Sequence, residues 1–156
     1  MEKKFFVFVL FILFGILTFQ AQTTAIPDAN FEDYLETHDN NGGLVDIGDD
    51  NSLGDGIADN GLVFTDRINT LLSLVISDLN IFDLTGIEDF TALETLICNA
   101  NSLSVLNIAN NTNLKTLLGS SNQLITLDNS LPTNQQIGRK DNRNGHPGTQ
   151  TARPHR

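Results

Sequence analysis

The sequence predicts an α/β repeat solenoid, in which an N-terminal capping helix precedes a parallel β-sheet. The pattern Leu-x-x-Leu-x-(Cys/Gly)-x-x-Asn-x-Leu-x-x-Leu occupies 93–106 and returns at 114–127. A less regular copy precedes them, in which Leu74 is the equivalent of Leu96. The spacing from Leu74 to Leu96 is one position longer than that from Leu96 to Leu117. A short, nearly constant period with spaced leucines and one fixed asparagine is typical of stacked repeats that share a continuous core.

The expected capping helix lies directly before the repeats, at about residues 26–37. Pro27 and Asp28 make a suitable helix start, with Asp28 as the N-cap. Phe31, Tyr34 and Leu35 are spaced i, i+3 and i+4, so they share one face of the helix. We expect this face to cover the first repeat, because an uncovered repeat would expose leucines and an unpaired strand edge to water.

The segment between the helix and the repeats, residues 38–63, is an acidic loop rich in Gly, Asn and Asp. These residue types favour turns, and a short hairpin is also compatible with them. Residues 23–63 are therefore assigned to the cap helix and this loop. Five hydrophobic residues are expected to pack the loop against the cap: Leu44, Val45, Ile57, Leu62 and Val63.

Residues 1–22 are predicted to be a secretory signal peptide. Lys3 and Lys4 precede an almost unbroken apolar run over 5–19, and Ala21 is the favoured last residue before cleavage. This run is shorter than the ~18 residues or more expected of a membrane span. We therefore expect a secreted or cell-surface protein with no membrane insertion after cleavage. An uncleaved membrane anchor is the alternative.

The charge is divided unevenly along the chain. Residues 22–137 hold 17 acidic and two basic residues, whereas 138–156 hold five basic residues and one acidic residue. An acidic surface repels nucleic-acid phosphates and anionic membranes and favours cationic partners, so no nucleic-acid partner is expected. Residues 135–156 contain few aliphatic side chains and are predicted to form a disordered basic tail.

Residues 64–134 are assigned to about three repeats, the last of them incomplete. Alternate residues of each short strand should point into the core. Each fixed asparagine falls where the chain leaves the strand, and there an amide side chain can satisfy backbone groups that the turn leaves unpaired. The residues of this structural ladder are Leu96, Cys98, Asn101, Leu103, Leu117, Asn122 and Leu124.

The stretch DLTGIEDFTALETLICNANSLSVLNIANNTNLKTL resembles the internalin-type leucine-rich repeats found in exported surface proteins of the Bacteroidetes. The opening IPDANFEDYLE is similar to the cap that precedes such repeats. The resemblance covers residues 26 to about 128. It implies a short leucine-rich-repeat solenoid, curved, with a parallel sheet on one face used to recognise proteins or glycans. The chain departs from the family in its small number of repeats and in lacking a recognisable C-terminal cap or sorting domain.

Outward-pointing strand residues are the candidate ligand contacts. The central outward column is apolar in all three repeats, which suits a protein or glycan surface. The alternative is that these residues were selected only as good strand formers. The candidate contacts are Val75, Ile97, Asn99, Leu118 and Ser120.

The acidic loop raises the hypothesis of a calcium site, because carboxylates among glycines are suitable Ca²⁺ ligands. No window has the spacing of an EF-hand loop, so the interpretation adopted is a solvated acidic loop with no metal or other cofactor. The carboxylates concerned are Asp39, Asp46, Asp49, Asp50, Asp55 and Asp59.

No enzyme is expected. Cys98, the single cysteine, falls at an inward position, where a thiol is structural rather than nucleophilic. The three histidines are not spaced with it for a metal site or a triad. Abundant carboxylates are all that favours a small exported hydrolase.

The leading interpretation is an exported, non-catalytic module for protein or glycan binding, or adhesion, at the bacterial cell surface. The alternative is a truncated or frame-shifted remnant of a longer repeat protein with little independent function. It is favoured by the loss of the pattern after Leu127 and by the change from an acidic to a basic composition.

Overall fold

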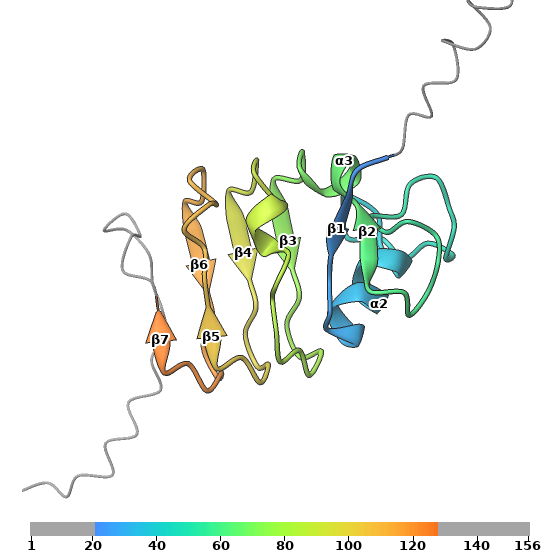
Figure 1. The fold of residues 1–156 in the computed structure, drawn as a ribbon. Coiled ribbons are helices and arrows are strands. Elements are labelled where there is room, and N and C mark those ends of the chain that lie inside the picture. The colour runs from blue at the N-terminus through green and yellow to red at the C-terminus, as the bar shows by residue number, and fades with distance from the viewer. Residues whose placement is uncertain (1–20, 128–156) are drawn as a thin grey trace, which may run out of the picture.

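The computed structural model describes residues 21–127. The predicted signal peptide up to residue 20, the last part of the repeat region (128–134) and the predicted tail (135–156) lie outside the described residues. No helix within 21–127 is long and apolar enough to cross a membrane. The elements, shown in Figure 1, are β1 (Thr23–Ala25), α2 (Ala29–Thr37), β2 (Leu62–Phe64), α3 (Thr65–Ile68), β3 (Ser73–Val75), the 3₁₀ turn η1 (Ile87–Asp89), β4 (Thr95–Ile97), β5 (Val105–Leu106), β6 (Thr116–Leu118) and β7 (Thr126–Leu127).

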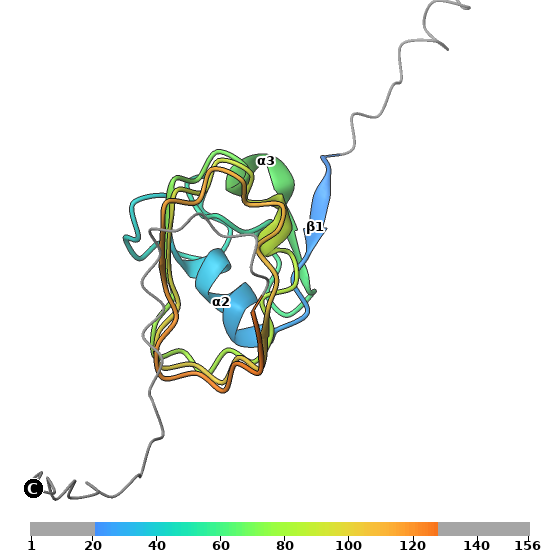
Figure 2. The same cartoon turned by 90° about the vertical axis from the view of Figure 1, so that its left-hand side faces the viewer.

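The repeats form a parallel sheet with the strand order β3-β4-β6. Ser73 pairs with Thr95, and Thr95 pairs with Thr116, so the nearly constant spacing brings equivalent residues side by side. Seen end on in Figure 2, the successive turns follow nearly the same outline. A second parallel pair, β5 with β7, also joins successive repeats. This pair was not predicted from the sequence.

Helix α2 starts where the sequence predicts, after Asp28. The Asp28 carboxylate accepts hydrogen bonds from the main-chain N–H groups of Asn30 and Phe31 at 3.0 and 3.1 Å, and so satisfies two groups that a helix start leaves unpaired. Phe31 and Leu35 are fully buried. The Phe31 ring stacks on Phe90 of the first repeat with centroids 6.0 Å apart, so the apolar face of the helix covers the end of the repeat core.

Two short strands that the sequence analysis missed complete the cap. β1 and β2 pair antiparallel, with Thr24 opposite Val63. Each strand has three residues, too few for an alternating pattern to stand out in a sequence. The buried Thr24 hydroxyl bonds to the Thr65 hydroxyl at 2.8 Å and to the Asp89 carboxylate at 2.7 Å. This side chain therefore links the cap to the first repeat.

The acidic loop is not held in the way the sequence analysis predicted. Leu44 is 81% exposed, Ile57 60% and Leu62 37%, so the prediction that these three pack against the cap was wrong. Of the five predicted residues, Val63 is buried and Val45 half-buried, while Leu53, which was not predicted, is also buried.

Two buried glutamates of α2 hold the loop instead. One Glu32 oxygen accepts hydrogen bonds from the N–H groups of Asn60 and Gly61, both at 2.9 Å. The Glu36 carboxylate accepts hydrogen bonds from Asp55 and Gly56 at 2.6 and 2.9 Å. Buried carboxylates require such donors. The loop is thus fixed by polar contacts, which a search for hydrophobic anchors does not detect.

The extra position in the first repeat lies beside the cap. Leu84 and Ile87 are three positions apart, whereas Leu106 and Ile108, their equivalents in the next repeat, are two apart. The extra position therefore lies next to Gly86. Gly86 has a φ of +97°, and a Cβ there would collide with the Ile26 side chain and lie 2.6 Å from the carbonyl oxygen of Ala25. The insertion allows the backbone of the first repeat to approach the cap closely.

Candidate binding surface

The outer face of the β3-β4-β6 sheet presents the side chains predicted to contact a ligand. In its central column Val75 is 50% exposed, and Ile97 and Leu118 are half-buried. Register pairing aligns the three side chains across the sheet. On one side of this column lie Ser73, Thr95 and Thr116, and on the other lie Ser77, Asn99 and Ser120.

The amide of Asn99 is fixed by the next repeat. Its Oδ1 accepts hydrogen bonds from the Ser120 main-chain N–H at 2.8 Å and from the Ser120 hydroxyl at 2.9 Å. Within the described part of the chain, the Nδ2 group makes no hydrogen bond. Asn99 therefore presents an oriented donor at the side of the apolar column.

Behind this face lies the structural ladder. Leu96, Cys98, Leu103 and Leu117 are buried, and Leu124 is half-buried and packs against the core. Burial raises the pKa of the Cys98 thiol to about 11, because removal from water disfavours the thiolate. Cys98 is thus neutral and shielded, a poor nucleophile.

Asn101 and Asn122 bind the backbone of the repeat before each of them. The Oδ1 atom of Asn101 accepts the N–H groups of Leu79 and Ile81, both at 3.1 Å, while its Nδ2 donates to the Ile76 carbonyl at 2.6 Å. Asn122 accepts the Leu103 N–H at 3.0 Å. These bonds fix the turns that follow the strands and so hold the sheet face in place.

A third asparagine with the same role was missed by the sequence analysis. Asn111 is buried, and its Nδ2 donates to the carbonyl oxygens of Ile87 and Phe90 at 2.7 and 3.1 Å. The equivalent position of the repeat before it is Phe90 itself, so a comparison of the repeats shows no fixed asparagine in this column. The carbonyl groups that Asn111 binds come within its reach only in three dimensions.

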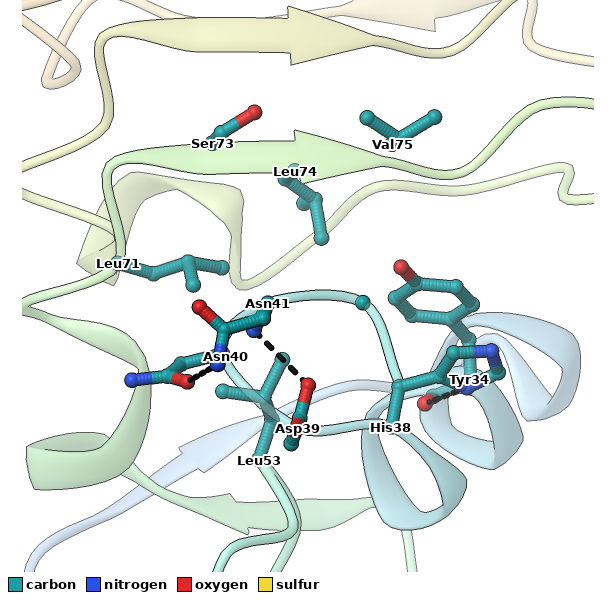
Figure 3. A pocket seen from close by; sticks show the side chains of 11 residues that line it. Tyr34, His38, Asp39, Asn40, Asn41, Leu53, Leu71, Ser73, Leu74 and Val75 are labelled. Carbon is teal, nitrogen blue, oxygen red and sulfur yellow. Dashed lines mark hydrogen bonds between the residues drawn. The ribbon is translucent and has the colours of Figure 1, made fainter. Parts of the chain in front are cut away.

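A hollow of about 510 Å³ lies between the cap and β3, beside the sheet face (Figure 3). Leu53, Leu71 and Leu74 form its apolar part, and Tyr34 and Asp39 lie at the cap side. The hollow lies where two segments distant in sequence meet, so no sequence motif marks it.

Tyr34, His38 and Asp39 are the titratable residues that line the hollow. Burial, and to a lesser degree the charge of Asp39, raise the pKa of Tyr34. The main-chain N–H groups of Gly43 and Asn41 lower the pKa of Asp39, so this carboxylate stays ionised at neutral pH. The hollow therefore combines an apolar interior with a negative rim.

Several loop carboxylates that raised the calcium hypothesis form turns. Asp39 accepts the N–H groups of Asn41 and Gly43 at 2.9 and 2.7 Å, and Asp49 and Asp55 each accept the N–H two residues later. Such bonds stabilise Asx-turns. Among residues 21–127, no group of three or more His, Cys, Asp or Glu residues is arranged to hold a metal ion.

Comparison with known proteins finds similarity among solved structures. No family model and no curated protein matches the sequence. Among solved structures, the functional domain of InlJ from Listeria monocytogenes, described as including a cysteine ladder, is 30% identical with a TM-score of 0.52. The match covers 71% of this chain and 22% of that domain, so the chain spans only about a fifth of its length. This similarity supports an internalin-like leucine-rich-repeat fold.

Proposed function

We propose that this protein is an exported, non-catalytic leucine-rich-repeat solenoid that binds a protein or glycan at the cell surface through its sheet face. The observation that carries the proposal is the aligned column of Val75, Ile97 and Leu118. It lies between hydroxyl groups on one side and the oriented amide of Asn99 on the other. Export rests on the signal-peptide pattern of residues 1–22.

The composition of this face suits flat ligands that are partly apolar. Aliphatic side chains pack against the C–H face of a sugar or against a partner's apolar surface, and the flanking amide and hydroxyl groups hydrogen-bond to polar edges. The face is already ordered by the ladder behind it, so binding costs little conformational entropy.

A glycan-array screen with the chain from Gln22 onward, followed by variants, tests the sheet face. In the double variant Ile97→Ser and Leu118→Ser, we expect the affinity for any bound glycan to fall at least about tenfold, because buried contact area is lost. The matched control is Ile125→Ser, which removes an isoleucine that is 86% exposed and not part of this sheet. Equal losses in both variants, or none in either, would refute the role of the sheet face.

Export has a separate test. We expect the full chain, expressed in a Gram-negative host, to be recovered outside the cytoplasm with an N-terminus at Gln22, as read by mass spectrometry. Recovery at full mass from the cytoplasm would contradict export but would leave the binding face untouched.

A further inference from the structure

Among residues 21–127, one edge of strand β3 has no pairing partner. Its hydrogen bonds to β4 include those from Thr95 N–H to the Leu72 carbonyl at 3.0 Å and from Ile76 N–H to the Ile97 carbonyl at 2.8 Å. Backbone groups alternate between the two edges of a parallel strand. The N–H and C=O groups of Ser73 and Val75 therefore point away from β4, and they make no hydrogen bond with any residue in 21–127.

The cap holds the first repeat elsewhere and leaves this edge uncovered. Asp28 accepts hydrogen bonds from the N–H groups of Phe82 and Asp83 at 2.7 and 3.1 Å, and Thr24 bonds to Asp89. Along β3, by contrast, the space next to the strand is the hollow of about 510 Å³. Figure 3 shows β3 crossing above the hollow, with the loop of residues 39–41 on its other side.

An unpaired strand edge beside an apolar hollow has the two features needed to bind a peptide as an additional strand of the sheet. Main-chain hydrogen bonds to the edge supply affinity, and a pocket for alternate side chains supplies selectivity. Here the edge is Ser73–Val75 and the pocket is formed by Leu53, Leu71 and Leu74. The volume is within the range of small-ligand pockets, roughly 300–1,000 Å³.

We propose that the open edge of β3 binds an extended polypeptide segment that bears basic side chains. Residues lining the hollow include Asp39 but no Lys or Arg, and residues 22–137 carry 17 acidic against two basic residues. A basic segment thus gains electrostatic attraction, whereas a second copy of this acidic region would be repelled. One side chain of the bound segment enters the hollow, and its neighbours extend toward Asp39 and the solvent.

This site is distinct from the sheet-face site, because it uses the main chain of β3 rather than outward side chains. Two variants separate the sites. Val75→Pro removes the edge N–H but keeps an apolar side chain, and proline is tolerated at strand edges. The Ile97→Ser, Leu118→Ser variant instead removes two apolar side chains of the sheet face that do not line the hollow.

The test uses the chain from Gln22 onward and a fluorescent heptapeptide of alternating lysine and valine. Binding is measured by fluorescence anisotropy. We expect Val75→Pro to weaken binding at least about fivefold, as loss of a main-chain hydrogen bond does, and the Ile97→Ser, Leu118→Ser variant to change it less than about twofold. A matching peptide with glutamate in place of lysine is expected not to bind.

Amide exchange in the wild-type protein gives a second readout that needs no variant. We expect the Ser73 and Val75 amides to exchange rapidly alone and slowly with the lysine peptide, while the Ile97→Ser, Leu118→Ser variant still binds it. The proposal is overturned if the peptide does not bind, or if Val75→Pro binds as tightly as wild type while these amides stay unprotected. Protection before the peptide is added would also overturn it, because the chain itself or a second copy would then occupy the edge.

Discussion

The Asp28 carboxylate accepts a hydrogen bond from the main-chain N–H of Phe82 at 2.7 Å, although the two residues are 54 positions apart in the sequence. Its other oxygen caps α2 through the N–H groups of Asn30 and Phe31. One side chain therefore starts the cap helix and also fastens it to the first repeat.

Removal of this carboxylate is expected to be costly. We expect Asp28→Ala to lower the free energy of unfolding by about 2–4 kcal/mol, because a helix cap is lost and the N–H groups of Phe82 and Asp83 lose their acceptor. Chemical denaturation measures the loss. The control is Asp33→Ala, at an exposed position of the same helix, which should cost less than about 0.5 kcal/mol.

The second prediction concerns the asparagine ladder. Asn101→Ala leaves the Leu79 and Ile81 N–H groups and the Ile76 carbonyl without this partner, and should lower the unfolding free energy by about 2–4 kcal/mol. Asn113→Ala is the matched control, because its bond to the Thr91 carbonyl is exposed and should contribute at most about 1 kcal/mol. If thermal unfolding shows the same loss of stability in Asn101→Ala and Asn113→Ala, the buried amide has no special role.

Two glycines should respond in opposite directions to the same substitution. Gly86→Ala places a Cβ against Ile26 and the Ala25 carbonyl at a positive φ. We therefore expect the free energy of unfolding to fall by more than about 2 kcal/mol. At Gly119 a Cβ would meet Cys98 Sγ at 3.6 Å, an ordinary contact distance. Gly119→Ala should therefore stabilise the fold by roughly 0.4–1 kcal/mol in chemical denaturation. A stable Gly86→Ala variant would contradict the close approach of cap and repeat.

The contact of Glu36 with the acidic loop has a pH signature. Burial raises the pKa of Glu36 above its ordinary value of 4.5, and the N–H groups of Asp55 and Gly56 only partly offset this. The folded state then binds the proton more tightly than the unfolded state, so the stability contributed by Glu36 falls as pH rises from 4.5 through the folded-state pKa. Relative to Glu36→Gln, the unfolding free energy of the wild type should decline across this interval. A constant difference between the two proteins would refute it.

Cys98 should be unreactive in the folded protein. With a pKa of about 11, only about one thiol in a thousand is ionised at pH 8, and the side chain is buried. We expect reaction with Ellman's reagent to be at least about 100-fold slower in buffer than in guanidinium chloride. As a control, Ser104→Cys in a Cys98→Ala background places a thiol at an exposed position and should react rapidly in buffer.

The elements that could be predicted from the sequence are those with local periodicity. Leu74, Leu96 and Leu117 recur at nearly constant spacing, and they align in the parallel sheet. Asp28 followed by an i, i+3, i+4 stripe marks a helix from its own residues. The first signal is a regular spacing along the chain and the second lies within one helix, so neither depends on knowing which distant segments touch.

The remainder depends on partners far away in the sequence. Glu32 and Glu36 look like ordinary solvated helix residues until the loop that they bind is placed next to them. The hollow beside β3 likewise requires Leu53 of the loop and Leu74 of the repeat to be brought together, and no periodicity in either segment predicts their meeting. Export and the ligand stay predictions, because they concern residues 1–20 and molecules other than this chain.

The asparagine hydrogen bonds imply an order in which the repeats complete their hydrogen bonding during synthesis. Asn101, Asn111 and Asn122 each bond to the backbone of the repeat that was synthesised before them. Each turn therefore acquires its last hydrogen-bond partners only after about 20 further residues have left the ribosome, a delay of roughly 1–4 s at ordinary synthesis rates. During synthesis, therefore, each repeat completes its hydrogen bonds only when the next repeat has been made, beginning with the repeat beside the cap.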